Sequence, residues 1–186
     1  MRILVAGLLG AVAMFIWTAI AHMATPLAYT GISKMQNEPA VLSVMQSGVG
    51  AKSGFYFYPW IDPKDPQAEQ KETALMKTNP SGFLIYHPAG ASYDMTPLML
   101  EEFGKELAQS LIEAFLLSLT ALAGYFSRVG FVTMLGVFGS LGTDMSYLIW
   151  YGFPCNYTLA QITIEVVGAL AAGLVIAWWM GRRASA

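Results

Sequence analysis

Residues 101–183 decide the fold, and they read EEFGKELAQSLIEAFLLSLTALAGYFSRVGFVTMLGVFGSLGTDMSYLIWYGFPCNYTLAQITIEVVGALAAGLVIAWWMGRR. Their apolar runs are long enough to cross a hydrocarbon core of about 30 Å as helices. We therefore predict three membrane crossings, over residues 108–126, 129–150 and 159–181. Each crossing contains one acidic residue, although the bilayer makes a charged side chain expensive. These residues are Glu113, Asp144 and Glu165.

The three acidic side chains are predicted to lie at one depth. Counted at about 1.5 Å per residue from the arginine-bearing ends of the crossings, each lies about 21 to 24 Å along its helix. In a hydrocarbon core about 30 Å thick, they form one layer about 6 to 9 Å below the outer surface. Three carboxylates in a medium of low dielectric constant cannot all ionise cheaply, so a shared proton or hydrogen bond is expected.

Composition places the chain among integral membrane proteins. Of its 186 residues, 55% are hydrophobic and 12% are charged, with a formal net charge of −2, which is too apolar for an ordinary soluble domain. The lysines and arginines form no basic patch suited to nucleic acid. The single cysteine, Cys155, rules out an internal disulfide and a cysteine-rich metal site. The two histidines, His22 and His87, leave little room for haem or zinc chemistry. We expect no cofactor and no metal.

Residues 1–25 form a further predicted membrane helix, which we interpret as a retained anchor. The apolar run from Ile3 to Ala24 is long enough to span the bilayer. The alternative is a cleaved signal peptide, because Ala19-Ile20-Ala21 fits a cleavage site. Small residues share one face with His22, which favours packing against other helices. His22 then lies above the three carboxylates and joins them as a candidate polar layer; the alternative places its ring among lipid headgroups.

The predicted fold is a mainly α-helical membrane protein with four transmembrane helices. A small extramembrane α+β segment, residues 26–106, is inserted between the first and second helices, and residues 107–186 form a three-helix bundle. The arginines flank the hydrophobic segments on one side: Arg2, Arg128, Arg182 and Arg183. By the positive-inside rule, both termini are cytoplasmic and residues 26–106 face outward. In a bacterial cell this predicts a multi-pass inner-membrane protein with a periplasmic segment.

The segment 26–106 is predicted to alternate short helices and strands. Asn37-Glu38-Pro39 opens the first helix, 37–46, and Asp65-Pro66 opens the second, 65–77. Prolines bound the aromatic strands, at 54–58 and 82–87. The strands are alike, which predicts a two-unit repeat whose strands pair into a ribbon covered by the helices. Chance similarity of short aromatic strands is the alternative.

Aromatic side chains are concentrated in these strands. They form a candidate outer aromatic surface of Tyr56, Tyr58, Trp60, Tyr86 and His87. A ligand pocket is one interpretation. The other is structural, because a very small domain needs aromatic side chains for its core, and tyrosine and tryptophan suit a membrane interface.

A long helix is predicted from Thr96 to Phe126, with Thr96 as its cap and Pro97 in its first turn. One face of it carries a polar stripe: Glu102, Glu106, Gln109 and Glu113. The stripe is either a hydrated path for ions or protons, or the face that the outer segment covers.

The last two crossings are rich in small residues at four-residue spacing. Such patterns let helix backbones approach closely, within the chain or against another protein. The candidate packing positions are Gly136, Gly139, Ser140, Gly142, Gly168 and Ala172.

We interpret the chain as a non-catalytic membrane protein, an accessory or structural subunit of a larger bacterial membrane complex. Its expected partners are membrane lipid and other membrane subunits or a second copy, and not nucleic acid. One alternative is an ion- or proton-handling channel or transporter element that uses the buried carboxylates. A membrane enzyme is the other, although the sequence shows no nucleophile–base arrangement, phosphate loop or dinucleotide fingerprint.

Overall fold

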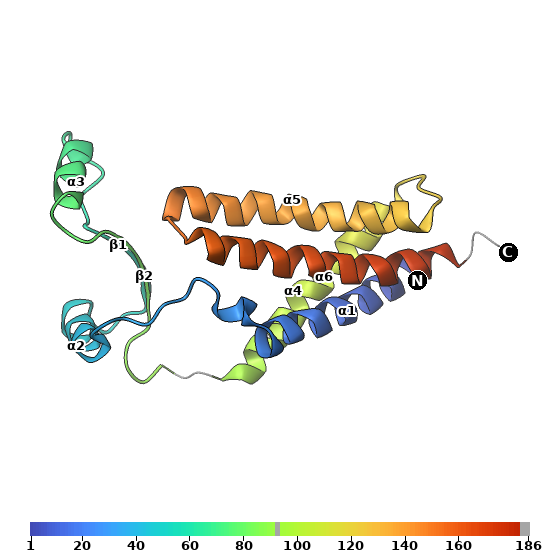
Figure 1. Ribbon diagram of the computed structural model, residues 1–186, viewed down its shortest axis with the longest axis horizontal. Helices are drawn as coiled ribbons and strands as arrows, with labels where there is room; N and C mark the ends of the chain where they lie inside the picture. Colours follow the sequence, from blue (N-terminus) through green and yellow to red (C-terminus); the bar gives the residue numbers. More distant parts are fainter. Residues whose placement is uncertain (92–93, 183–186) are drawn as a thin grey trace. The chain divides into compact units, whose positions relative to one another are not determined.

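The computed structural model describes residues 1–91 and 94–182, and the chain divides into two compact units (Figure 1). The bundle unit comprises Met1–Ile32 and Asp94–Ala186, and the ribbon unit comprises Ser33–Tyr93. Residues 95–106, which were predicted to belong to the extramembrane segment, begin a helix of the bundle unit.

The described part of the bundle unit contains four long helices and one short 3-10 turn. These are α1 (Arg2–Ala24), η1 (Pro26–Tyr29), α4 (Met95–Ser118), α5 (Tyr125–Tyr151) and α6 (Cys155–Gly181). Helix α1 packs against α4 and α6, and α6 packs along α5, whereas α4 and α5 meet over only a short stretch. In Figure 1, α5 and α6 run side by side and α4 lies at an angle to them. The four helices therefore form an open row, in which α4 and α5 are the outer members.

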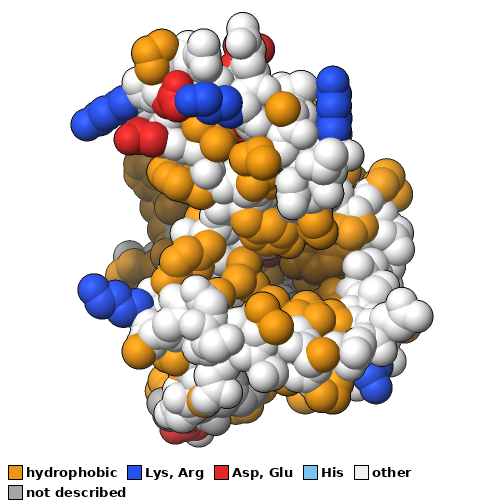
Figure 2. All heavy atoms as spheres, turned by 90° about the vertical axis from the view of Figure 1, so that its left-hand side faces the viewer, with side chains coloured by type: hydrophobic (Ala, Val, Ile, Leu, Met, Phe, Trp, Pro, Cys, Tyr) orange, Lys and Arg blue, Asp and Glu red, His pale blue; other side chains and the backbone are white. Residues whose placement is uncertain are grey.

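Among the residues that the structure describes, three helices are long and apolar enough to cross a membrane: α1, α5 and α6. All three carry exposed apolar side chains along their length. Figure 2 shows hydrophobic side chains lying open on the face of the molecule that it draws. On α1, the exposed apolar residues recur every four positions, at Leu4, Leu8, Val12, Ile16 and Ile20. This spacing forms one stripe along the helix, as a lipid-facing surface requires. The structure is mostly helical, with three candidate membrane-spanning helices and one small sheet.

The predicted second crossing, 108–126, is not one continuous helix. Helix α4 ends at Ser118 and α5 begins at Tyr125, so the single helix predicted from Thr96 to Phe126 is wrong. The Ser118 hydroxyl donates to the Phe115 carbonyl, and the Thr120 hydroxyl donates to the Leu117 carbonyl. Side chains that take backbone acceptors in this way compete with the helix and favour its end.

Helix α4 also differs from the other three in charge. It is not among the candidate spans, because its 24 residues include Glu101, Glu102, Lys105, Glu106 and Glu113. From Glu106 to its end the helix is about 20 Å long, shorter than a hydrocarbon core of about 30 Å. Its N-cap also differs from the prediction: the Asp94 carboxylate, and not Thr96, caps α4 by accepting from the Thr96 N–H at 2.9 Å.

Small residues hold α6 against its neighbours. A methyl group at Gly136 of α5 would collide with the Cβ of Ala169, and one at Gly173 would lie 3.2 Å from the Cβ of Val132. These glycines therefore let the backbones of α5 and α6 approach closely. The hydrophobic core of the bundle unit continues from this contact into α1 and α4. Its buried members are Ala6, Met14, Ala114, Leu117, Val132, Ala172 and Ile176.

Arginines gather at one end of the bundle unit. An Arg2 guanidinium N–H donates to the Met180 carbonyl at the end of α6 (2.6 Å), and the Arg128 Nε donates to the Leu122 carbonyl (2.9 Å). A methyl group at Gly181 would lie 2.8 Å from Arg128 Nη1, and the Arg182 guanidinium stacks 3.8 Å from the Trp178 ring centroid. The described arginines therefore share one end; Arg183 lies outside the described residues.

The ribbon unit consists of α2 (Glu38–Gly48), β1 (Gly54–Tyr58), α3 (Ala68–Met76) and β2 (Gly82–Tyr86). The two strands pair antiparallel, with Phe55 opposite Ile85 and Phe57 opposite Phe83, so the predicted ribbon is confirmed. Neither described helix packs extensively on it, and neither helix contains a buried residue. The expected cover by the helices is therefore wrong. The polar composition of α3, AEQKETALM, leaves it little apolar surface to bury.

The start of α3 is stabilised by an acidic side chain outside the bundle. Asp65 accepts a hydrogen bond from the Gln67 N–H at 2.8 Å and from the Lys71 ammonium at 2.5 Å. The bond from Lys71 holds the pKa of Asp65 below its ordinary value of 3.8, and the Gln67 N–H acts in the same direction. Asp65 thus opens the turn before the helix, which begins three residues later than Asp65 itself.

Candidate functional site

Helices α4, α5 and α6 surround a cavity of about 540 Å³, which we call the carboxylate cavity. Glu113 from α4, Asp144 from α5 and Glu165 from α6 all line it. The three acidic residues that were predicted to share one depth thus meet around one space. Apolar side chains from α4 and α5 complete much of the lining, among them Ile112, Leu116, Leu135 and Phe138.

Helical periodicity explains which residues reach the cavity. On α4, Lys105, Gln109 and Leu116 follow one another at four- and seven-residue spacings, and all line the cavity. On α5, Ser140 and Asp144 are four residues apart and line the same wall. Each helix therefore presents one stripe of its surface to the cavity.

The cavity is open on one side. Its lining includes Ile112 of α4 and Phe138 of α5, which are 59% and 78% exposed. Because α4 and α5 meet only briefly, the space between them forms a groove at the surface of the bundle unit. We call this the α4–α5 groove; in a membrane, lipid or another protein must cover it.

Glu113 is the most deeply buried of the three acids. Glu113 is 2% exposed, and neither of its carboxyl oxygens has a hydrogen-bond partner among the described residues. Ser140, across the cavity, is 3% exposed and its hydroxyl likewise lacks a partner there. Asp144 and Glu165 are only partly buried. Burying a polar group without a partner costs free energy, so Glu113 and Ser140 are the groups in this cavity that most require one.

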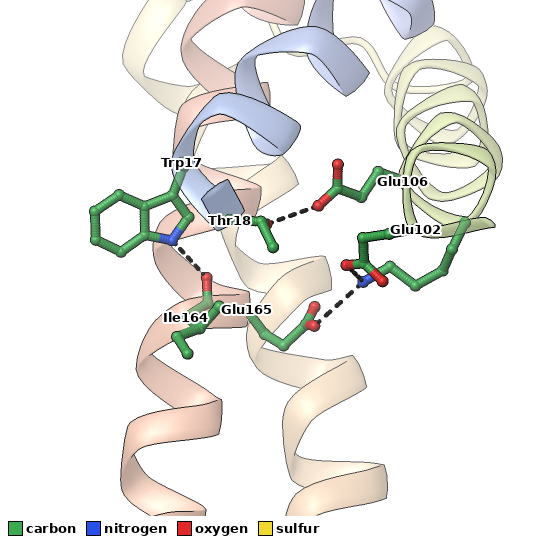
Figure 3. A network of polar contacts seen from close by, with 7 residues as sticks. Trp17, Thr18, Glu102, Glu106, Ile164 and Glu165 are labelled. Atoms are coloured by element: carbon green, nitrogen blue, oxygen red, sulfur yellow. Dashed lines mark hydrogen bonds and ion pairs between the residues drawn. The ribbon is translucent and has the colours of Figure 1, made fainter. Parts of the chain in front are cut away.

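Lys105 is the cation nearest to the acids, and its role was not predicted from the sequence. Its ammonium lies 2.8 Å from Glu102 Oε1 and 3.6 Å from Glu165 Oε1, so it connects α4 with α6 (Figure 3). One signal was available, because Lys105 follows Glu102 by three residues, a spacing that places both on one helix face. Its partner on α6, in contrast, depends on how the two helices are rotated.

The polar stripe of α4 divides between two neighbours. Gln109 and Glu113 line the carboxylate cavity, whereas Glu106 faces α1 and is fully buried, where its Oε1 accepts from the Thr18 hydroxyl at 2.7 Å. The other oxygen, Oε2, has no partner among the described residues. Helix α1 therefore covers the part of α4 that carries Glu106. Figure 3 shows this contact beside that of Trp17, whose Nε1 donates to the Ile164 carbonyl at 2.9 Å.

His22 lies apart from the three carboxylates. It is exposed, and it lines a separate groove of about 340 Å³ between α1 and α4, together with Met23, Met95 and Met99. Of the four residues in the candidate polar layer, the three acids line the carboxylate cavity, whereas His22 lines a different groove.

The candidate packing positions fall into two groups. Gly136 adjoins Ala169, Gly168 adjoins Met14 and Trp17, and Ala172 is fully buried. Gly139 and Gly142 differ, because a methyl group at either would meet nothing within 4 Å. Gly139 lines the carboxylate cavity, so this second group lies on a face of α5 that the described residues leave open.

Most residues of the candidate aromatic surface belong to the two strands of the ribbon and make contacts within the ribbon unit. The strand register places Tyr56, Tyr58 and Tyr86 on one face of the ribbon. The Tyr86 hydroxyl donates to the Gly50 carbonyl at 3.1 Å, and its ring is 6.4 Å from that of Tyr56. Trp60 and His87 lie beyond the strand ends and are exposed. These contacts favour the structural interpretation of Tyr56 and Tyr86.

The arrangement of the carboxylate cavity limits its chemistry. Within the part of the chain that the structure describes, no group of three or more histidine, cysteine, aspartate and glutamate residues could hold a metal ion. A cavity of this size, with mostly apolar walls and a few convergent polar groups, suits an organic group better than a bare ion. A comparison with protein-family models, curated proteins and solved structures finds no match to this chain.

Proposed function

We propose that this chain is a non-catalytic integral membrane protein that serves as an accessory or structural subunit of a larger membrane assembly. One observation carries the proposal: buried polar groups without partners among the described residues, Glu113 and Ser140, line a groove that is open at the surface. In lipid there is no water to satisfy such groups. Another protein that covers the α4–α5 groove supplies both the missing polar partners and the missing packing.

Two further features support a protein rather than lipid in this groove. The first is the open face of α5 at Gly139 and Gly142, because small residues elsewhere in the same bundle serve close helix contact. The second is α4, whose apolar part is short and whose charged residues are poorly suited to lipid. A neighbouring subunit would shelter both.

For orientation, we place the arginine-bearing end of the bundle unit in the cytoplasm, by the positive-inside rule. The segment between α1 and α4 then faces outward, which in bacteria is the periplasm, and α4 makes the fourth crossing beside α1. Labelling of whole cells with a membrane-impermeant thiol reagent tests this. Cys155 at the start of α6 is exposed and is expected to react, whereas a cysteine at Ser127, in a variant without Cys155, is expected to be protected.

Site-specific photo-crosslinking in the native membrane tests the subunit assignment. A benzoylphenylalanine at Gly139, in the open groove, is expected to form a crosslink to another protein chain. The matched control is the same probe at Ile16, on the exposed apolar stripe of α1, where lipid adducts are expected. Native mass spectrometry after gentle extraction then gives the stoichiometry. Lipid adducts alone at both positions would contradict the proposal.

Proton or cation handling is the second candidate, and the burial of Glu113 beside Asp144 and Glu165 favours it. Proton flux into liposomes that contain the purified protein tests it. A flux that the native protein supports and that Glu113→Gln abolishes would favour this candidate. The subunit proposal expects no flux from either form.

A further inference from the structure

From the carboxylate cavity we infer that the partner is a different chain, whose membrane helix lies in the α4–α5 groove and places one lysine or arginine against Glu113 and Asp144. This inference rests on the proposed function and specifies the chemistry of the partner. Three properties of the groove support it: its unbalanced charge, its shape, and the depth of its acidic residues.

The charges of the cavity are unbalanced. Three carboxylic acids line it, and the one basic residue among the lining residues is Lys105. Lys105 is already within 2.8 Å of Glu102 and 3.6 Å of Glu165. Glu113 and Asp144 are therefore left without a cation among the described residues, and Glu113 has no hydrogen-bond partner there either. An ammonium or guanidinium group would satisfy both requirements, since it supplies charge and several donors.

The shape of the site suits a helix that carries a long basic side chain. Ile112, Leu116 and Leu135 offer apolar surface on which the methylene stem of lysine or arginine can lie while its charged end reaches the acids. Gly139 opens the wall of α5 to the backbone of a neighbouring helix. A metal ion fits less well, because the described acidic residues form no metal-binding group.

The partner is not a second copy of this chain. No lysine or arginine occurs between Arg2 and Lys34 or between Arg128 and Arg182, so α1, α5 and α6 have no basic residue at the depth of the acids. On α4, Lys105 lies about 12 Å nearer the outer end of the helix than Glu113, and its ammonium is already paired with Glu102 and Glu165. On the partner helix, the basic residue is expected at the depth of Asp144 and Glu165, about 22 to 24 Å from the cytoplasmic end when counted along the continuous helices α5 and α6. At about 1.5 Å per residue this is roughly 15 or 16 residues along the helix.

A synthetic helix tests the inference directly. The probe is a leucine- and alanine-rich transmembrane peptide with one lysine at the matched depth, in phosphatidylcholine vesicles with the purified full-length protein. A donor fluorophore on the exposed Cys155 and an acceptor on the outer end of the peptide report association by energy transfer. The controls are the same peptide with leucine in place of lysine, and with the lysine moved seven residues deeper, about 10 Å. We expect at least tenfold tighter association for the matched peptide than for either control.

Variants of the protein assign the effect to the cavity. Glu113→Gln and Asp144→Asn together are expected to reduce the preference for the lysine peptide to about twofold or less. Glu106→Gln is the matched control, because Glu106 lies on the same helix but faces Thr18 of α1, and it is expected to keep the preference. Each variant is compared at equal folded fraction by size-exclusion chromatography. Asp144→Asn alone serves if the double variant does not fold, since Asp144 is only partly buried.

The outcomes separate this inference from the proposed function. Equal association of the native protein with the lysine and leucine peptides would overturn the inference. A partner that crosslinks at Gly139 but has no basic residue near the matched depth would also overturn it and leave the subunit assignment intact, as would a crosslinked second copy. Lipid adducts alone at Gly139, together with a strong lysine preference, would contradict the subunit assignment while supporting a site for a basic group.

Discussion

Helix α5 has two neighbours in the bundle, and it meets them in opposite ways. Toward α6 the contact is closed, since Gly136 adjoins Ala169 and Gly173 adjoins Val132. Toward α4 the contact is open. A methyl group at Gly139, only three residues from Gly136, would meet nothing within 4 Å, and the acids around the cavity include Glu113, which has no partner among the described residues. The two sides use the same residue types, so composition does not distinguish a finished interface from an unfinished one.

The two sides of α5 differ in two ways: in how closely the helices approach each other, and in whether buried polar atoms have hydrogen-bond partners. Where the interface is closed, small residues of the two helices lie in direct contact. Where it is open, polar atoms have neither a described protein partner nor, in a membrane, water to bond. A subunit that is removed from its assembly is expected to show such an open interface, with buried polar atoms that have no partner.

The largest expected effect is that of a large side chain on the closed side. Gly136→Leu is expected to lower the free energy of unfolding by about 3 kcal/mol or more, because the new side chain collides with Ala169 and forces α5 away from α6. Thermal unfolding in detergent measures this. Gly139→Leu is the matched control, and it is expected to leave the stability of the isolated protein nearly unchanged. Equal losses for both variants would show that the isolated chain closes the groove by itself.

Glu106 provides the second test, on the side of α4 that α1 covers. Glu106→Ala is expected to cost about 1 to 3 kcal/mol of stability, because it removes the acceptor of the Thr18 hydroxyl from a fully buried position. Glu106→Gln keeps an acceptor and should cost less. The same denaturation assay ranks the two variants. If the alanine variant is as stable as the native protein, the α1–α4 contact is not a closed interface.

Lys105 is expected to contribute less, because its side chain is 47% exposed and its partner Glu165 is 38% exposed. A double-mutant cycle with Lys105→Met and Glu165→Gln is expected to give a coupling energy below about 1 kcal/mol, and increasing salt should reduce it. A coupling of several kcal/mol would mean that this ion pair closes the cavity toward α6 more firmly than its exposure indicates.

Removal of the Ser140 hydroxyl is expected to have the smallest effect on stability. The direction of the change shows whether the hydroxyl has a partner. Because its hydroxyl is buried without a partner among the described residues, Ser140→Ala should leave the stability of the isolated protein unchanged or slightly raise it. Thr18→Val, which removes a hydroxyl that does have a partner, should lower it by about 1 kcal/mol. In the intact assembly the expectation for Ser140→Ala reverses, if a partner uses this hydroxyl. Subunit retention in native gels measures that second effect.

Local signals were enough to predict the elements of the ribbon unit. The strands at Gly54–Tyr58 and Gly82–Tyr86 and the helix at Glu38–Gly48 agree with turn and capping residues that act within a few positions. The error at α4 is also local in origin, because serine and threonine hydroxyls end the helix where hydrophobicity alone predicts its continuation. The missing cover over the ribbon is a different kind of error, since it concerns packing between elements.

By itself, the sequence determined that the chain is mostly helical and that it has apolar helices long enough to cross a membrane, because both follow from composition and from the constant rise of a helix per residue. The common depth of Glu113, Asp144 and Glu165 stays a prediction, since the helix along which Glu113 was counted ends at Ser118; the structure shows that all three residues line one cavity. Only the tertiary structure decided that Gly136 is closed and Gly139 open, that Glu106 faces α1, and that Lys105 reaches Glu165. Periodicity determines which residues share a helix face, but the rotation of each helix against its neighbours comes from packing along its whole length.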